Sequence, residues 1–295
     1  MTDTEERGGE LILSVVIPAY RAEKTIRQAI QSAFSAGAGE VIVVDDGSDD
    51  STAELSRAAG ARCFVQINSG AAEARKNGAG QAAGDFLIFL DADDELVPDG
   101  VRRSVEVLQA NNDLVVAAGR VIGVGGDGLE RPFPIRFDPV TTQTLLVHGH
   151  GPWPPAAAVV RRSAYFEARD LDPEPLAPRF AEDYELLIRL SMTGGVDVRD
   201  DFTCRYSLAG GKSVASADSA IEAKESIRDY YAKALEIPID LMSIRRRQMA
   251  AIARVARAHW AQGHRLRALR SMSQWLMKDP AYAISKLATS PWRRN

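Results

Sequence analysis

The sequence predicts an α/β fold: a Rossmann-like, mostly parallel central sheet flanked by helices, followed by a C-terminal α-helical extension. Three observations predict it. Short apolar runs without alternation recur over the first 90 residues, as in strands that are buried on both faces. Segments with helical spacing separate these runs, and the connections are short. From about residue 219 the chain becomes basic and helical.

The elements follow one another in strand–helix order. Strands are predicted at 11–18, 41–44, 62–66 and 86–90, and the helices between them at 23–36, 51–59 and 71–83. Beyond these we expect a helix at 98–110, a strand within 113–124, a short strand at 159–162, a helix from 182 and late strands within 196–209. The proline-rich residues 129–158 are expected to be irregular, and a loop of that length is usually functional.

The strand Phe86–Leu90 leads directly into acidic residues. Asp91, Asp93 and Asp94 should therefore project from the carboxyl edge of the sheet, where open α/β sheets bind their ligands. Clustered carboxylates repel one another unless a cation or protons neutralise them, and oxygen ligands on a short loop suit Mg²⁺ or Mn²⁺. The alternative is a helix start. We expect that role for Asp94 and Glu95, and the ion site for Asp91 and Asp93.

Two other strand ends carry residues that can face a ligand. Pro18, Ala19 and Tyr20 follow the first strand, and Asp45-Asp46-Gly47-Ser48 follows the second. A turn with a helix cap is the alternative for the second group, and we expect Asp45 to be structural and Asp46 to bind ligand. The chain has no glycine-rich dinucleotide or P-loop pattern, so a metal ion is expected to hold any bound phosphate.

Bulk properties indicate an ordinary globular protein of 295 residues with net charge −4. Residues 1–10 are polar and acidic and are expected to be disordered, with no signal peptide. No apolar run approaches the roughly 20 residues that span a bilayer. Cys63 and Cys204 are expected to be buried thiols of a reducing compartment. We expect a cytoplasmic protein.

The charge is unevenly distributed. Residues 220–295 hold 15 Lys/Arg and 6 Asp/Glu, whereas residues 1–219 hold 21 and 34. We expect a domain at 11–218 and a basic helical extension at 219–295. The helices of this extension can pack on their own domain, form a homodimer, or contact the inner face of a membrane peripherally. A nucleic-acid partner is not expected.

Five motifs, taken together, resemble family-2 glycosyltransferases of the GT-A fold. They are Val15–Tyr20, Val43–Ser48, Arg75–Asp85, Phe89–Asp94 and Glu182–Tyr184, which occur in the family's order within residues 11–210. The resemblance implies an inverting enzyme that moves a sugar from a nucleotide-diphosphate donor, expected to be a UDP-sugar, to a carbohydrate or lipid-linked acceptor. Such enzymes serve cell-surface polysaccharide or glycoconjugate synthesis.

The resemblance also implies residue roles on the donor side. Pro18, Ala19 and Tyr20 would line the nucleotide pocket, Asp46 would accept from the base, and Arg75 would lie near the base or the diphosphate. Asp91-Ala92-Asp93 matches the DXD motif: Asp93 would bind Mn²⁺ or Mg²⁺ directly, and Asp91 would contact the ribose or a metal-bound water. Arg21 departs from the pattern, since the family usually has Asn after the Tyr.

On the acceptor side, Asp183 matches the catalytic base of the family's ED motif, and Glu182 would support it or contact the acceptor. His150 and His148 lie on a Gly/Pro loop without further metal ligands, so an acceptor-loop role is expected. Trp153 either stacks on a sugar or pins this loop. Lys212 and Ser213 are expected to close over the diphosphate.

Two other functions stay open from the sequence. One is a nucleotide-sugar-binding protein without transferase activity, against which Asp93 and Asp183 argue. The other is a nucleotidyltransferase, which would carry a glycine-rich, basic loop after the first strand. Residues 18–23 contain no glycine, which disfavours it.

Overall fold

The computed structural model describes residues 12–208, 217–261, 263–278 and 280. Within these residues the chain forms two compact units: the first takes in 12–123, 132–177 and 182–206, and the second takes in 124–131, 178–181 and the described residues from 207 onward. Lys212, Ser213 and residues 1–10 lie outside the described part. The domain border at 218/219 stays a prediction.

Nine strands of the described residues form one sheet, with eight of them in the order β3-β2-β1-β4-β8-β6-β9-β5 and β7 (Glu130–Pro132) off this path. The parallel strands are β1 (Leu13–Ala19), β2 (Glu40–Asp45), β3 (Arg62–Val65) and β4 (Phe86–Phe89). β8 (Ala158–Arg161) runs antiparallel between β4 and β6 (Leu114–Val124). β5 (Glu95–Leu96) pairs antiparallel with β9 (Gly195–Ser207).

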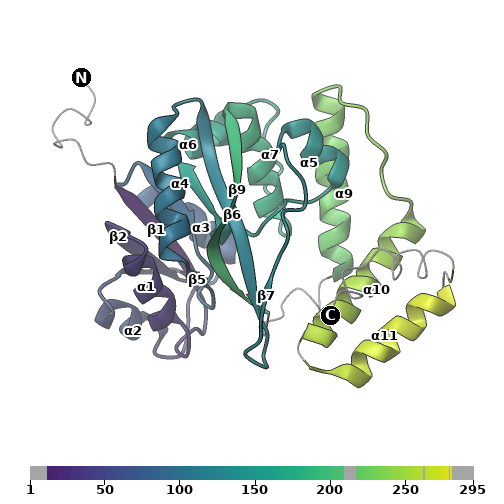
Figure 1. Ribbon diagram of the computed structural model, residues 1–295, viewed down its shortest axis with the longest axis horizontal. Helices are drawn as coiled ribbons and strands as arrows, with labels where there is room; N and C mark the ends of the chain where they lie inside the picture. Colours follow the sequence, from purple (N-terminus) through teal and green to yellow (C-terminus); the bar gives the residue numbers. More distant parts are fainter. Residues whose placement is uncertain (1–11, 209–216, 262, 279, 281–295) are drawn as a thin grey trace. The chain divides into compact units, whose positions relative to one another are not determined.

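Helices cover both faces of this sheet (Figure 1). Along β1 the side chains alternate: Val15 and Ile17 face a core with α1 (Ile26–Ser35) and α4 (Pro98–Ala110), whereas Val16 faces the opposite core. That second core includes α3 (Ala71–Gln81), α6 (Arg162–Asp170) and α7 (Glu182–Thr193). The α/β prediction is confirmed: β1, β2 and β4 are buried on both faces, as their apolar runs indicated, whereas the edge strand β3 is largely exposed.

Three shorter helices complete the first unit. α2 (Thr52–Ala58) follows β2, as predicted. α5 (Thr142–His148) and the 3₁₀ turn η1 (Pro155–Ala157) lie within the segment that was expected to be irregular. α5 begins with a capping box between Thr141 and Thr144, a local signal that the proline content of the segment masked.

The expectation that Asp94 and Glu95 start a helix is wrong. α4 begins at Pro98, and Glu95 lies in β5, where it pairs with Arg205 of β9. Asp94 is buried at 2% exposure. The pairing with a strand more than a hundred residues away overrides the local preference of acidic residues for a helix start.

The second unit contains three described helices: α9 (Ala217–Ala234), α10 (Ile244–Ala261) and α11 (Arg265–Lys278). A buried ion pair of 2.6 Å joins Arg228 and Glu225 on α9. Glu225 also accepts from the backbone N–H of Met242, and Arg228 donates to the carbonyl of Asp240. These bonds fix the segment between α9 and α10, because each charge is satisfied within the unit. No described helix combines the length and apolar character that crossing a bilayer requires.

Candidate active site

Three neighbouring parallel strands end at one edge of the sheet, and a predicted site residue follows each. β1 ends at Ala19, whose carbonyl accepts from the N–H of Asp46 at 2.8 Å. Asp46 directly follows β2. Leu90, at the end of β4, donates to the carbonyl of Val16 at 3.0 Å, and Asp91 comes next. The topology therefore brings Tyr20, Asp46 and Asp91 to the same edge.

Asp46 holds the loop that leads into α3. Its carboxylate is 5% exposed and accepts from the backbone N–H groups of Ser69 at 2.7 Å and Gly70 at 2.9 Å. The side-chain amide of Gln66 adds a third bond of 2.9 Å. An ionised carboxylate has about four acceptor sites, so one is left for a ligand. Asp46 thus orders the loop before α3, and its role in binding a ligand stays a prediction.

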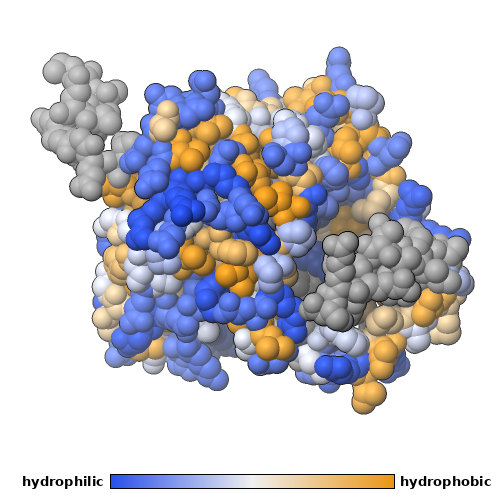
Figure 2. Space-filling view, viewed as in Figure 1, coloured by the Kyte–Doolittle hydropathy of each residue, from blue (hydrophilic) through white to orange (hydrophobic). Residues whose placement is uncertain are grey.

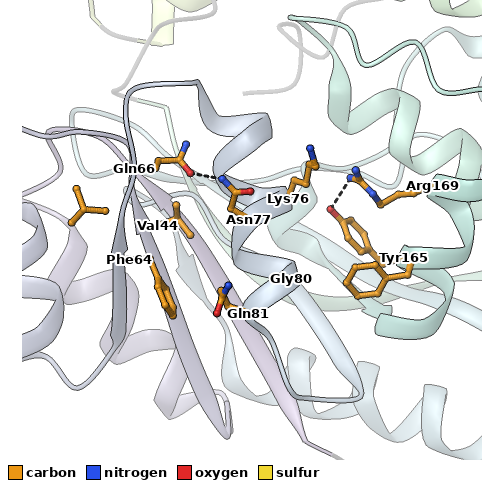
Figure 3. Close-up of a pocket in the computed structure, with 11 residues that line it drawn as sticks. Val44, Phe64, Gln66, Lys76, Asn77, Gly80, Gln81, Tyr165 and Arg169 are labelled. Atoms are coloured by element: carbon orange, nitrogen blue, oxygen red, sulfur yellow. Dashed lines mark hydrogen bonds between the residues drawn. The ribbon is translucent and has the colours of Figure 1, made fainter.

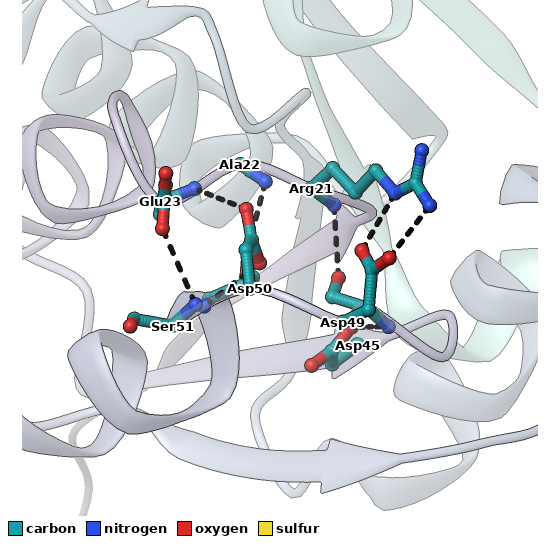
Figure 4. A network of polar contacts seen from close by, with 9 residues as sticks. Arg21, Ala22, Glu23, Asp45, Asp49, Asp50 and Ser51 are labelled. Carbon is teal, nitrogen blue, oxygen red and sulfur yellow. Dashed lines mark hydrogen bonds and ion pairs between the residues drawn. The ribbon is translucent and has the colours of Figure 1, made fainter.

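A polar network fixes the turn that follows Tyr20 (Figure 4). The guanidinium of Arg21 forms two bonds of 2.7 Å with Asp49, and its backbone N–H donates to Ser48. Arg21 has φ of 51°, in the left-handed region where Asn is more common than Arg. Asn is the residue usual in the family at this position. Here the ion pair with Asp49 helps to hold Arg21 in this conformation.

Arg75 on α3 joins the two acidic motifs. Its Nη2 donates to Asp91 Oδ1 at 2.6 Å and its Nη1 donates to Glu182 Oε1 at 2.7 Å. The Arg75 side chain is 15% exposed, compared with 39% for Asp91 and 29% for Glu182. One guanidinium therefore holds the loop after β4 and the first turn of α7 together.

Asp183 lies exposed in the first turn of α7, next to this ion pair in sequence. The following residues anchor the helix: the Tyr184 hydroxyl donates to the carbonyl of Leu145 at 2.8 Å, and Glu185 accepts from the N–H of Leu176 at 2.7 Å. Asp183 is thus open to solvent on a fixed helix start.

The acids are close enough to shift one another's titration. Burial raises the pKa of Glu182, the negative charge of Asp183 adds to this effect, and the cation of Arg75 opposes it. For Arg75 itself, burial lowers the pKa, but Asp91, Glu182 and Asp183 outweigh it, so the net shift is upward. Arg75 therefore stays charged, and it remains a permanent partner for two carboxylates.

The sequence did not indicate Tyr206, a residue of β9. Burial raises the pKa of its phenol, and the carboxylates of Asp94, Asp91, Asp93 and Asp183 raise it further. Burial also raises the pKa of the Cys204 thiol, and the charges of Asp94, Asp91 and Glu95 raise it further. Tyr206 is thus a neutral hydroxyl facing the acidic edge. Only the antiparallel pairing of β9 with β5 reveals this, since nothing local marks the residue.

The acidic edge suits a divalent ion that is shared with a substrate. Asp91 and Asp93 offer oxygen ligands on one short loop, with Asp91 half-exposed and Asp93 exposed. In the described part of the chain, no cluster of three or more His, Cys, Asp or Glu side chains forms a complete protein site. Mg²⁺ is commonly held by one or two carboxylates, with phosphate oxygens and water completing the shell. The donor set fits that arrangement.

Trp153, His148 and His150 were predicted on the acceptor side, and the structure gives their protein contacts. Trp153 is half-buried and packs against both core clusters, as expected of a residue that pins the loop. The ring of His148 stacks on Phe137 with centroids 4.2 Å apart, and His150 lies 5.7 Å from the same ring. Nδ1 of His150 is 3.0 Å from the carbonyl oxygen of Gly151. Trp153 therefore packs on the core, whereas the two histidines lie beside the Phe137 ring, and their acceptor-side roles stay predictions.

Comparison with known proteins identifies the family. The sequence profile of glycosyl transferase family 2 matches residues 14–166. The chain therefore belongs to this family of glycosyltransferases. The solved structure of S. aureus TarS 1–349 in complex with UDP-GlcNAc aligns with a TM-score of 0.58 over 92% of this chain and 83% of that one, at 19% identity. A Pyrobaculum calidifontis mannosyltransferase in complex with GDP-Man and Mn²⁺ aligns with a TM-score of 0.54 over 96% and 80%, at 16% identity. These neighbours establish the GT-A fold.

Three curated relatives show the range of the family. The glycosyltransferase YibD of Escherichia coli is 34% identical over 36% of this chain and 32% of its own length. The undecaprenyl-phosphate 4-deoxy-4-formamido-L-arabinose transferase of Pseudomonas aeruginosa is 31% identical over 48% and 45%. The succinoglycan biosynthesis protein ExoO of Rhizobium meliloti is 30% identical over 62% and 56%. The matched segment thus spans between a third and just over half of these relatives.

Proposed function

We propose that this chain is an inverting glycosyltransferase that moves a sugar from a nucleotide-diphosphate donor, with UDP-sugar as the expected donor, to a hydroxyl acceptor. One observation carries the proposal: Arg75 holds the Asp91-Ala92-Asp93 loop and the Glu182-Asp183 helix start together. A diphosphate site and a general base within one cluster are what single-displacement sugar transfer needs.

On the donor side, Pro18, Ala19, Tyr20 and Asp46 would bind the nucleoside, and Asp91 with Asp93 would hold Mg²⁺ or Mn²⁺. The ion would supply Lewis-acid stabilisation of the leaving diphosphate. Arg75 orients Asp91 and lends positive charge to the same edge. Tyr206, being neutral, can donate a hydrogen bond there. Each of these groups acts on the donor, so their loss is expected to weaken donor binding.

On the acceptor side, Asp183 would take the proton from the attacking hydroxyl. Glu182 is held by Arg75 at 2.7 Å, so its proposed role is to position the cation and the helix start. The test is Asp183→Asn, which keeps the shape but removes the base. We expect sugar transfer to be lost while nucleotide-sugar binding, measured by calorimetry, stays within about twofold. Normal turnover by Asp183→Asn would refute the assignment. Sugar transfer by the wild type in the same assay would distinguish an enzyme from a non-catalytic binding protein.

The acceptor class is proposed from the second unit and from the relatives. Residues 241–278 contain nine Lys/Arg and no Asp or Glu. On α11, Leu266, Leu269 and Met277 are 84%, 53% and 75% exposed, at spacings that place them on one side of the helix. Figure 2 shows apolar side chains along α11 beside charged ones. A basic helix with an exposed apolar stripe is typical of an anionic membrane surface.

A membrane contact would suit a lipid-linked acceptor in cell-surface polysaccharide synthesis. The P. aeruginosa relative is named for an undecaprenyl-phosphate substrate, and ExoO is named for succinoglycan biosynthesis. We therefore propose a peripheral protein at the cytoplasmic face of a membrane. A homodimer through the same helices is the competing proposal, and it predicts a second copy rather than lipid on this surface.

A further inference from the structure

A depression of about 510 Å³ crosses the outer face of α3 (Figure 3). The ends of β2 and β3 line one side, and α6 lines the other. Lys76, Asn77, Gly80 and Gln81 of α3 form its floor, and none of the lining residues has a part in the proposed transfer reaction. We call this depression the α3–α6 groove.

The lining of the α3–α6 groove combines three kinds of chemistry. Aromatic rings come from both sides, with Phe64 on β3 and Tyr165 and Phe166 on α6. Three side-chain amides supply donors and acceptors. Two cations are present, whereas none of the described lining residues is Asp or Glu. Rings, amides and positive charge in one concave site fit a ligand with an apolar face, hydroxyl groups and a negative charge.

Arg169 is the cation that can take the negative charge. Its Nη1 lies 3.5 Å from the Tyr165 hydroxyl, and the described residues give it no carboxylate partner. Lys76, in contrast, is already paired with Glu73 at 3.1 Å. An arginine guanidinium matches phosphate and carboxylate groups in a two-pronged geometry. The anionic group of a ligand would therefore lie on the α6 side.

The amides of the groove connect it to Asp46. Asn77 donates to the Gln66 side-chain oxygen at 2.7 Å, and Gln66 donates to Asp46 at 2.9 Å. Figure 3 shows the first of these bonds between α3 and the end of β3. These bonds leave Asn77 its amide oxygen and one N–H for a ligand. The groove is thus pre-organised by the same network that orders the loop before α3.

We infer that the α3–α6 groove is a saccharide-binding site, separate from the donor site, for a sugar that carries a phosphate or a carboxylate. Sugar hydroxyls would bond to Gln66 and Asn77, a ring face would pack on Phe64 or Phe166, and the anionic group would pair with Arg169. A hexose phosphate and a hexuronic acid share this chemistry. The inference requires no activity of Asp183 and no metal at Asp93.

Gly80 offers a steric test. A Cβ built on Gly80 meets no atom within 4 Å, although the residue lines the groove from the last turn of α3. Gly80→Trp therefore adds bulk to the groove without displacing the core. Gly80→Ala adds one methyl group and is the matched control, with a gain in helix stability of up to about 1 kcal/mol.

Calorimetric titration of the full chain with glucose 1-phosphate, glucuronate and glucose tests the inference. We expect at least one of the two anions to bind, and glucose to bind about tenfold more weakly or worse. Gly80→Trp should abolish this binding, and Gly80→Ala should retain it. Arg169→Gln should weaken the anion about tenfold and leave glucose unchanged. Asp93→Ala should bind the anion as the wild type does.

Three results would overturn the inference: no binding of either anion to the wild type, unchanged binding by Gly80→Trp, or equal loss in Asp93→Ala. Thermal melts show whether each variant is folded. If Gly80→Trp does not fold, Arg169→Gln decides, because unchanged anion binding by that variant also contradicts the site. Normal sugar transfer by Asp183→Asn or Asp93→Ala would contradict the transferase proposal and would leave the groove inference unaffected.

Discussion

Arg75 and Glu182 lie 107 positions apart in the chain and form an ion pair of 2.7 Å. The same guanidinium bonds to Asp91 at 2.6 Å. Each of the two acidic motifs is a short run of neighbouring residues, whereas Arg75 links them across a long stretch of the chain. These bonds make one cluster from a strand end, a helix face and a helix start, and they give Arg75 a part in positioning both halves of the proposed site.

Replacing Arg75 should affect stability and nucleotide binding together. Arg75→Met keeps the bulk but leaves Asp91 and Glu182 without their cation. We expect unfolding in urea to show a loss of about 1–3 kcal/mol, less than for a fully buried pair because both carboxylates are partly exposed. Binding of UDP with Mn²⁺ should weaken about tenfold.

The neighbouring Lys76 is the matched control. It is 48% exposed and pairs with Glu73 on its own helix. Lys76→Met should change the free energy of unfolding by less than about 0.5 kcal/mol. Equal effects of the two substitutions would mean that Arg75 stabilises the helix surface and does not join the motifs.

Glu182 should make stability depend on pH in a particular direction. Its folded-state pKa is raised above the ordinary value of 4.5, chiefly by burial. The stabilisation from this carboxyl group is therefore complete below pH 4.5 and is lost as the pH rises through the folded-state pKa. In Glu182→Gln the free energy of unfolding should decline less steeply above pH 4.5 than in the wild type.

Urea denaturation at a series of pH values measures this slope. Glu73→Gln serves as the control, since Glu73 is 42% exposed and pairs with Lys76 on the surface of α3. An identical pH dependence in Glu182→Gln and the wild type would show that the folded-state titration of Glu182 is ordinary.

Leu266 and Leu269 on α11 should determine membrane binding. Burying an exposed leucine side chain contributes roughly 2 kcal/mol, so Leu266→Ser with Leu269→Ser should reduce partitioning more than tenfold. The assay is co-sedimentation with vesicles that contain phosphatidylglycerol, compared with neutral phosphatidylcholine. Added salt should weaken the wild-type binding, because the arginines beside the stripe contribute through their charge.

Leu129→Ser is a matched control, since Leu129 is 59% exposed outside the C-terminal helices. If the wild type sediments with neither vesicle type, the membrane proposal is contradicted. Sedimentation of the wild type as a dimer, reduced to a monomer by the double substitution, would favour the homodimer instead.

The sequence predicted the strands and helices well where the pattern was local. The apolar runs 41–44 and 86–90 lie in or overlap β2 and β4, and their acidic endings reach one sheet edge as expected. The errors occurred where a distant strand intervened. Glu95 lies in β5 because β9 pairs with it, and Tyr206 faces the acids for the same reason. No local pattern encodes such a pairing.

The roles of individual acids were harder to predict than their location. The sequence assigned Asp46 to a ligand, whereas the structure also gives it three hydrogen bonds to the loop before α3. The placement of Arg75 near the base or the diphosphate stays a prediction, and the structure adds that its guanidinium bonds to two carboxylates. These partners depend on how the helices dock, which spacing along the chain does not specify.

Metal-dependent donor binding at Asp91 and Asp93 is the central claim, and a thermal-shift screen of nucleotide sugars with and without Mn²⁺ tests it most directly. At least one nucleotide sugar should raise the melting temperature of the wild type only when Mn²⁺ is present, and Asp93→Ala should abolish that shift while Asp99→Ala, on the surface of α4, retains it. If no nucleotide sugar gives an Mn²⁺-dependent shift, or if Asp93→Ala gives the same shift as the wild type, the claim is contradicted.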